Sequence, residues 1–170
     1  MIAAFRTNHS GIHHMAGRID ARLKELNIEL PGPTEPSVAK ILNATLANGF
    51  LFVSGQVPRV GGKISFVGKV GREFDLAKGQ EAAKVSAYNV LAHARAALGG
   101  DLDRIERVMK LTGYVNAMPT FTEIPQVVNG ASQVFIDVFG ENGRHARTAV
   151  GVAVMPFDVA IEVEGIFLVK

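Results

Sequence analysis

The apolar positions of two long segments recur at the spacing of an amphipathic helix. The first segment follows Asp75, a typical helix-capping residue, and ends at the glycine pair 99–100. Its apolar stripe consists of Leu76, Ala83, Ala87, Leu91, Ala94 and Leu98. The second segment follows Thr120 or Thr122 and ends at Gly140. Its buried side is predicted to consist of Ile124, Val128, Ala131, Phe135 and Val138.

Alternating or continuous apolar residues predict short strands around these helices. The predicted strands cover residues 41–47, 50–57, 63–67, 105–116, 147–154 and 159–169. Asn48-Gly49 is a strong hairpin signal between the first two strands. Residues 155–158 join the last two strands tightly, which predicts a second hairpin. Along the long strand 105–116, the residues expected on one face are Met109, Leu111, Gly113 and Val115.

This order of elements predicts an α+β fold. A short helix is expected over residues 17–27, and residues 1–15, which show no clear period, are expected to be a loose extension before a single domain over residues 16–170. Two amphipathic helices bury their stripes by packing on one face of a mixed sheet, which makes a two-layer sandwich. The other sheet face also carries many apolar residues, and a subunit interface is the natural cover for it.

The composition is that of an ordinary globular protein. Of 170 residues, 48% are apolar and 20% are charged, and the net charge of +2 gives little support for nucleic-acid binding. Cysteine is absent, which excludes disulfides, a thiolate nucleophile and a cysteine-ligated zinc. No run approaches 18 apolar residues, and no apolar export signal is found near the N-terminus. We therefore expect a cytoplasmic protein with no membrane partner.

Several motif-like segments do not support the chemistry that they suggest. Residues 60–65 are similar to the end of a phosphate-binding loop, but Val57 occupies the position of its first glycine. Ser54 precedes a strand, whereas a nucleophile elbow precedes a helix. His93 falls inside the long helix and His145 in a polar loop, and neither has a carboxylate at an informative spacing. We expect no metal and no cofactor.

Three charged residues in the last two predicted strands remain as candidates for chemistry: Arg147, Glu162 and Glu164. Arg147 opens a strand of small apolar residues, and the two glutamates share one face of an apolar strand. They can be rim residues or structural ion pairs. They can also form a site, in which the arginine binds a carboxylate through two hydrogen bonds and a glutamate positions a water molecule.

The predicted hairpin sets a distance between the two kinds of charge. A hairpin closed at Val154 places Arg147 opposite Ile166. Ile166 is four residues from Glu162, a separation of about 13 Å along an extended strand. One arginine would not share a small substrate with Glu162 of its own chain at this separation. We therefore expect the two residues to meet across a subunit interface.

The C-terminal run HARTAVGVAVMPFDVAIEVEGIFLV resembles the signature of the RidA/YjgF family, formerly called L-PSP endoribonuclease-like. That signature has an arginine opening a strand, a Leu-Pro-like turn (here residues 155–156) and a strand with alternating glutamates. FLFVSGQVP resembles the second strand of the family, and RVMKLTGYVNAMPTF resembles its central strand and turn. The resemblance covers residues 35–170 and is strongest to a less characterised branch. It implies a chorismate-mutase-like homotrimer with clefts between subunits.

The resemblance also implies roles for individual residues. Arg147 takes the position of the arginine that binds the substrate carboxylate, and Glu162 that of the glutamate that holds the water. Gly55, which follows Ser54, offers backbone groups to the nitrogen end of the substrate. Asn129 matches an asparagine near the pocket.

Two positions depart from the family pattern. Ile41 stands where the family has a tyrosine on the first strand, and Ala149 stands where it has a cysteine two residues after the arginine. Neither side chain is needed as a covalent nucleophile, because water adds directly to an imine. The missing tyrosine hydroxyl is expected to change substrate choice or to weaken deamination.

These observations leave two main hypotheses about function. The resemblance implies hydrolysis of reactive 2-enamine and 2-imine acids to 2-keto acids and ammonia, which the retained Arg147 and Glu162 favour. The alternative is a non-catalytic trimer that binds a small carboxylate metabolite at the same cleft, which Ile41 favours. Ribonuclease activity, suggested by the older family name, is not supported because the sequence lacks a basic surface interleaved with aromatic residues.

Overall fold

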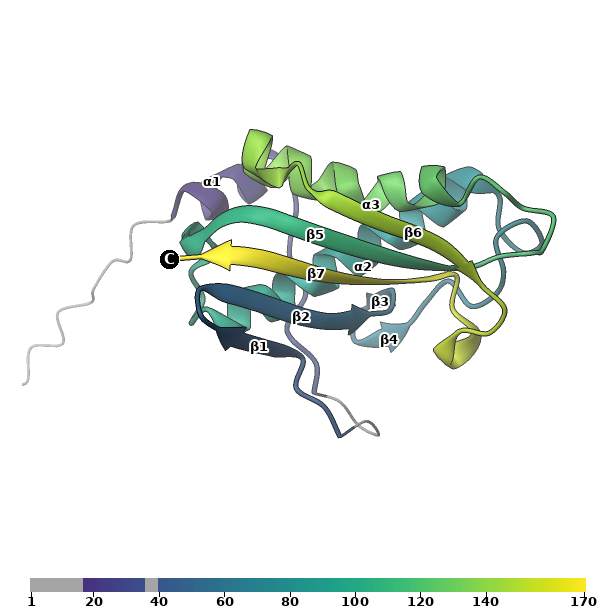
Figure 1. Cartoon of the computed structure of the whole chain (residues 1–170), viewed down its shortest axis with the longest axis horizontal. Coiled ribbons are helices and arrows are strands. Elements are labelled where there is room, and N and C mark those ends of the chain that lie inside the picture. The colour runs from purple at the N-terminus through teal and green to yellow at the C-terminus, as the bar shows by residue number, and fades with distance from the viewer. Residues whose placement is uncertain (1–16, 36–39) are drawn as a thin grey trace, which may run out of the picture.

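A five-stranded sheet with two helices packed on one face forms the body of the molecule (Figure 1). The computed structural model describes residues 17–35 and 40–170, so the expected extension over residues 1–15 lies outside the described residues. The helices are α1 (Arg18–Glu25), α2 (Leu76–Ala97) and α3 (Ile124–Phe139), with short 3-10 helices η1 (Leu102–Arg104), η2 (Gly140–Gly143) and η3 (Pro156–Asp158). The strands are β1 (Ala44–Ala47), β2 (Phe50–Gln56), β3 (Arg59–Val60), β4 (Lys63–Ile64), β5 (Ile105–Asn116), β6 (Ala146–Val152) and β7 (Ile161–Val169).

The strands of the main sheet are ordered β1-β2-β7-β5-β6, and β3 pairs separately with β4. β5 and β6 run parallel while the other neighbours run antiparallel, so the sheet is mixed, as expected. α3 connects β5 to β6, and a helical crossover is what brings a following strand parallel to the preceding one. The predicted hairpin between the last two strands is therefore wrong, because β5 lies between β6 and β7.

Most predicted elements are present, with shifted ends. The Asp75 side chain caps α2 by accepting a hydrogen bond of 2.8 Å from a backbone N–H of its first turn. Asn48 and Gly49 have φ values of 49° and 78°, as a tight hairpin turn between β1 and β2 requires. The strand expected over residues 41–47 begins only at Ala44, and the strand expected over residues 63–67 is limited to β4.

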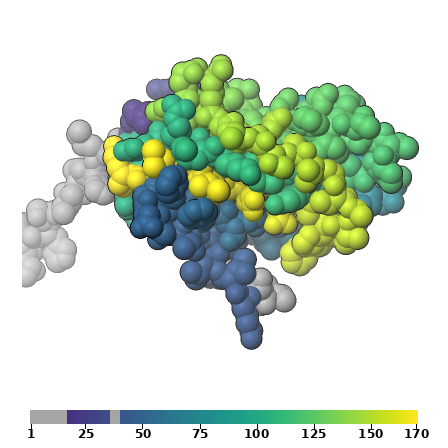
Figure 2. All heavy atoms as spheres, in the orientation of Figure 1, coloured from purple at the N-terminus to yellow at the C-terminus, as the bar shows by residue number. Residues whose placement is uncertain are grey.

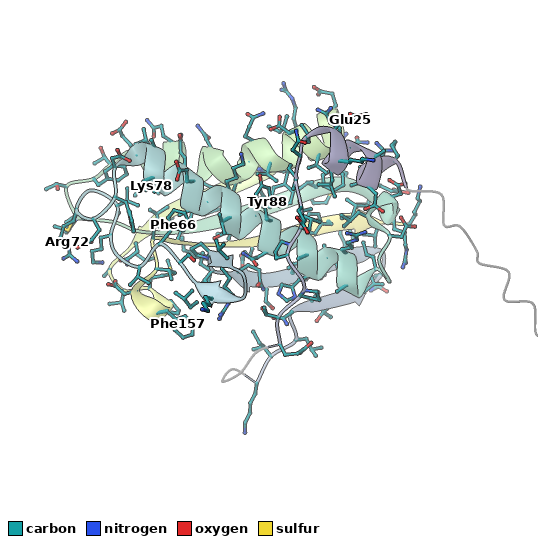
Figure 3. All side chains as sticks on the ribbon, turned by 180° about the vertical axis from the view of Figure 1, so that it is seen from behind. Glu25, Phe66, Arg72, Lys78, Tyr88 and Phe157 are labelled. Atoms are coloured by element: carbon teal, nitrogen blue, oxygen red, sulfur yellow. The ribbon has the colours of Figure 1, made fainter. Side chains whose placement is uncertain are left out.

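One face of the sheet is sealed by α2 and α3, as Figure 3 shows from the helix side. Along β7 the buried positions alternate strictly with partly exposed ones. The buried set consists of Ile161, Val163, Gly165, Phe167 and Val169. Met109 of β5 was expected on this face but is 37% exposed. The β5–β7 register shifts between Val108 and Lys110, and such a bulge turns Met109 away from the helices.

The two long helices pack closely against each other and against β5. A Cβ atom added to Gly130 of α3 would lie well under 3.0 Å from the backbone carbonyl of Gln80 in α2. A Cβ atom at Gly113 of β5 would lie 2.6 Å from the Val128 side chain of α3. These glycines allow a backbone-to-helix approach that fixes the position of α3 on the sheet. None of the helices in the described residues is long and apolar enough to cross a membrane.

The opposite face of the sheet is not covered by any helix in the described residues and faces the viewer in Figures 1 and 2. Phe50 and Phe52 of β2 pair with Leu168 and Ile166 of β7, so their side chains form one apolar patch on this face. Phe52 is 45% exposed. We call this surface the open face. Its exposed apolar side chains agree with the expectation that the second face of the sheet is also apolar, and the subunit that would cover it stays a prediction.

Replacement of Gly130 by alanine is predicted to destabilise the protein. The added methyl group meets the backbone of α2, which moves only if the helix pair separates, so we expect a loss of about 1–3 kcal/mol. Urea unfolding monitored by circular dichroism measures this loss. Gly32→Ala is the matched control, because nothing lies within 4 Å of a Cβ atom there. Equal stability of the two variants would contradict the proposed helix contact.

Candidate functional site

Arg147 reaches toward α3 from the edge strand of the sheet. Its Cα pairs with that of Leu111 in β5, which is buried on the helix side, so Arg147 also faces this side. Its Nη1 atom donates hydrogen bonds to Asn129 Oδ1 at 2.8 Å and to Ser132 Oγ at 3.1 Å. Asn129 and Ser132 are three residues apart and share one face of α3. The structure thus brings the predicted residues Arg147 and Asn129 together.

The remaining edge of the Arg147 guanidinium group is available for a ligand. Both hydrogen bonds of Arg147 within the described part of the chain use Nη1, so Nε and Nη2 keep their hydrogens unpaired there. Arg147 is partly exposed. Nε–H and the neighbouring Nη2–H form a planar fork that matches the two oxygens of a carboxylate. The geometry therefore suits bidentate binding of a carboxylate.

Ser132 and His145 belong to the same cluster but were not selected from the sequence. Ser132 Oγ lies 3.0 Å from His145 Nε2, and His145 Nδ1 lies 2.6 Å from the carbonyl oxygen of Gly143. His145 was set aside because no carboxylate follows at an informative spacing. The useful signal was instead its place two residues before Arg147, since such positions share a face of extended chain.

Ala149 lies two residues after Arg147 on the same side of β6. Its Cα pairs with Gly113 of β5, and its side chain packs partly buried against the core. The methyl group therefore lies on the same side of β6 as Arg147, and its role in the site stays a prediction.

Glu162 stands on the open face, beside Gly55. Its neighbours Ile161 and Val163 are fully buried on the helix side, so the Glu162 side chain points the other way. A Cβ atom at Gly55 would lie well under 3.0 Å from Glu162 Oε1, so only glycine leaves room for the carboxylate at this place. Burial raises the pKa of Glu162, and the charge of Glu164 raises it further.

Tyr114 and Glu164 complete the polar group on the open face. Glu164 points to the same side of β7 as Glu162, and Tyr114 of β5 pairs with Glu162. The Tyr114 hydroxyl donates a hydrogen bond of 3.4 Å to Glu164 Oε1. Burial raises the pKa of Tyr114, and the charge of Glu164 adds to the increase. Tyr114 was not selected as a site residue from the sequence.

The contacts of Ser54 and Ile41 differ from those expected of residues that line the site. The Ser54 hydroxyl donates a hydrogen bond of 2.7 Å to the carbonyl oxygen of Leu42, so it holds down the segment before β1. Ile41 lies in that segment, outside β1, and is 53% exposed. Neither position presents a free hydroxyl group beside Gly55.

Arg147 and Glu162 are well separated within one chain. Arg147 is level with Leu111 of β5, and Glu162 is level with Tyr114, three residues further along and two strands away. These steps correspond to about 10 Å along the strands and about 10 Å across them. The two side chains also point to opposite faces of the sheet. The separation of Arg147 and Glu162 was predicted from a β6–β7 hairpin, which is absent. The observed strand order nevertheless keeps the two residues apart.

The described residues offer no ready metal site. Within residues 17–35 and 40–170, no three His, Asp or Glu side chains are grouped so that they could hold a metal ion.

Comparison with known proteins identifies the family. The model of the family described as "YjgF/chorismate mutase-like, putative endoribonuclease" matches residues 20–167. Protein TCP17 of Trypanosoma cruzi is 44% identical over 155 residues, which cover 89% of this chain and 94% of that protein. The chain therefore belongs to the YjgF/chorismate mutase-like family, and the family resemblance found in the sequence is confirmed.

Two solved structures show the same architecture. Atu1372 of Agrobacterium tumefaciens, whose function is unknown, is 45% identical with a TM-score of 0.83, covering 89% of this chain and 92% of that one. A protein of Shewanella oneidensis called a putative endoribonuclease is 28% identical with a TM-score of 0.85, covering 89% of this chain and 99% of that one. The predicted α+β, chorismate-mutase-like fold is thus confirmed.

The coupling between the two glutamates on the open face can be measured directly. Glu164→Gln removes one of the two causes that raise the pKa of Glu162, so that pKa is predicted to fall. It stays above its ordinary value because the carboxyl remains buried, which is the larger cause. Carboxyl carbon-13 NMR across a pH titration follows Glu162 in both proteins. Glu141→Gln, an exposed site on η2, is the control. An unchanged Glu162 pKa in Glu164→Gln would show that the two side chains do not interact.

Proposed function

We propose that this protein hydrolyses 2-imine and 2-enamine acids to 2-keto acids and ammonia. The observation that carries the proposal is the arrangement of Arg147, which α3 holds through Nη1 while its Nε and Nη2 edge stays unpaired in the described part of the chain. A guanidinium edge of this kind favours a planar carboxylate ligand. Small acids with a reactive C=N bond next to the carboxylate fit this class of ligand.

Glu162 supplies the acid–base group for the reaction. Burial raises its pKa. The higher pKa lies closer to neutral pH, where a carboxyl group can both accept and return a proton. In the proposed first step, Glu162 takes a proton from water, the water oxygen bonds to the iminium carbon, and the C=N electron pair moves to nitrogen. The product of this step is a 2-amino-2-hydroxy acid.

The second step releases ammonia. Glu162 returns its proton to the nitrogen, the C–N bond breaks, and the hydroxyl oxygen forms the new C=O bond. The hydroxyl proton leaves with ammonia, so that iminium acid and water become keto acid and ammonium. General acid–base catalysis contributes about 10²–10⁴-fold, and orientation by Arg147 adds to it.

The two halves of the site are proposed to come from different subunits of a homotrimer. Arg147 and Glu162 point to opposite faces of one sheet, so a single chain does not present both to one small molecule. The apolar patch on the open face, with Phe52 45% exposed, supports an assembly that covers this surface. The Nε and Nη2 edge of Arg147 in one subunit would then lie beside Glu162 of the neighbouring subunit.

A binding protein without catalysis is the second candidate, and the region before β1 favours it. Ile41 is exposed in a bend, and the hydroxyl of Ser54 is committed to Leu42. The site therefore gains no hydroxyl group from these two positions to assist the leaving nitrogen. In this case the cleft would bind a small carboxylate and release it unchanged.

The proposed reaction is tested by a coupled assay. An amino-acid oxidase generates 2-iminopropanoate or 2-iminobutanoate, semicarbazide traps the imine, and hydrolysis by the protein lowers the trapped amount. Arg147→Ala is predicted to lose at least about ten-fold in kcat/KM, since it removes a charged bidentate contact.

Two controls make this loss interpretable. Arg144→Ala removes a nearby arginine whose guanidinium pairs, among the residues that the structure describes, only with exposed Glu141, and it should keep full activity. Light scattering checks that each variant keeps the oligomeric state of the wild type. A well-assembled wild type without effect on any imine would refute the deaminase proposal, and binding of keto acids by that protein would support the second candidate.

A further inference from the structure

A continuous hydrogen-bond chain leads from Arg147 into the protein. Ser132 is 9% exposed, and its Oγ accepts a hydrogen bond from Arg147 Nη1 at 3.1 Å. The same Oγ lies 3.0 Å from His145 Nε2, and His145 Nδ1 lies 2.6 Å from Gly143 O. These hydrogen bonds therefore connect β6, α3 and η2.

The two end groups of this hydrogen-bond chain fix the direction of its first and last hydrogen bonds. The direction of the middle one, between Ser132 and His145, depends on the protonation of the ring. A guanidinium group only donates, so Ser132 Oγ is the acceptor for Arg147. A backbone carbonyl only accepts, so His145 Nδ1 carries a hydrogen and donates it to Gly143. In a neutral imidazole Nε2 is then an acceptor, and the Ser132 hydroxyl donates to it. With His145 in this tautomer, every polar group of the hydrogen-bond chain has a partner.

The surroundings of His145 favour the neutral ring. Its ring packs edge-on against Phe135, with centroids 6.2 Å apart and planes at 76°. Burial lowers the pKa of His145, the hydrogen bond to Gly143 opposes this change, and the charge of Arg147 lowers the pKa further. A protonated ring would place a second positive charge beside the guanidinium group and would turn Nε2 into a donor.

The far end of the chain is anchored by close backbone packing. A Cβ atom at Gly143 would lie well under 3.0 Å from the carbonyl oxygen of Phe135. Gly143 is buried and presses directly on the C-terminal part of α3. The carbonyl that receives the His145 hydrogen bond is thus held at a defined place relative to Ser132, which belongs to the same helix.

We propose that Ser132 and His145 are positioning residues, which orient Arg147 so that its Nε and Nη2 edge faces the ligand carboxylate. The inference rests on the proposed function for the identity of that ligand, a small 2-keto or 2-imine acid. Asn129 holds the same Nη1 atom but is exposed, so Ser132 is the buried contact that water competes with least. Loss of the hydroxyl leaves Nη1 with only the exposed Asn129 contact among the described residues, which holds the guanidinium group less firmly.

Nitrogen-15 NMR tests the hydrogen-bond chain without any substrate. The wild type should show His145 in the neutral form protonated at Nδ1 and slow rotation of the Arg147 Nη groups. Ser132→Ala should make that rotation fast. The Kd for 2-oxobutanoate, measured by calorimetry, should rise on the order of ten-fold, because a guanidinium group that Ser132 no longer holds must be ordered when the ligand binds.

Two serine variants are matched controls. Ser132→Thr keeps a hydroxyl at the same place and should restore slow Arg147 rotation and most of the affinity. Ser86→Ala removes a fully buried hydroxyl on α2 that has no hydrogen-bond partner in the described residues, and it should change neither readout. These controls separate the loss of positioning from general loosening of the core.

The outcomes distinguish this inference from the proposed function. An Nε2-protonated His145, or Arg147 rotation that is equally slow in Ser132→Ala, would overturn the positioning role whatever the protein catalyses. If the NMR results are as expected but wild type does not bind 2-oxobutanoate, the hydrogen-bond chain stands and the carboxylate ligand of the proposed function is wrong.

Discussion

Parallel pairing of β6 with β5 determines which surfaces the candidate side chains can reach. The crossover through α3 places β6 at the sheet edge, so Arg147 and Ala149 face the helix layer. Glu162 and Glu164, two strands away, face the side that no helix covers in the described residues. The sheet itself therefore stands between the cation and the carboxylates. A site that uses both kinds of charge on one small ligand needs a second copy of the chain.

Each half of the proposed site is tightly built. On the helix side, Asn129 and Ser132 accept the hydrogen bonds of Arg147 Nη1, His145 contacts Ser132 in turn, and the fork-shaped edge of the guanidinium group stays unpaired in the described residues. On the open face, the absence of a side chain at Gly55 leaves room for the Glu162 carboxylate beside the backbone. Burial raises the pKa of that carboxyl. A partly desolvated acid and a fixed cation are the two groups that the proposed hydrolysis of an imine acid would use.

Much of the fold could be predicted because its signals are local. Helical stripes, the Asp75 cap and a family resemblance over most of the chain were sufficient for the architecture. The local signals did not predict the strand order. The tight turn between β6 and β7 has the same sequence pattern whether these two strands pair directly or have β5 between them. The bulge that exposes Met109 leaves no local mark either. The roles of Ser132 and His145 depend on a tertiary contact between α3 and the start of β6, and the segment that engages Ser54 depends on loop geometry.

The central claim is that Arg147 and Glu162 of different subunits serve one site, and mixed oligomers test it most directly. Arg147→Ala and Glu162→Gln chains, each with its own low activity measured alone, are co-refolded in equal amounts and assayed for imine hydrolysis. In a randomly mixed trimer with shared sites, every mixed oligomer regains one intact site, and about one quarter of wild-type activity returns. Activity no higher than that of either parent, from oligomers shown to contain both chains, would contradict the account.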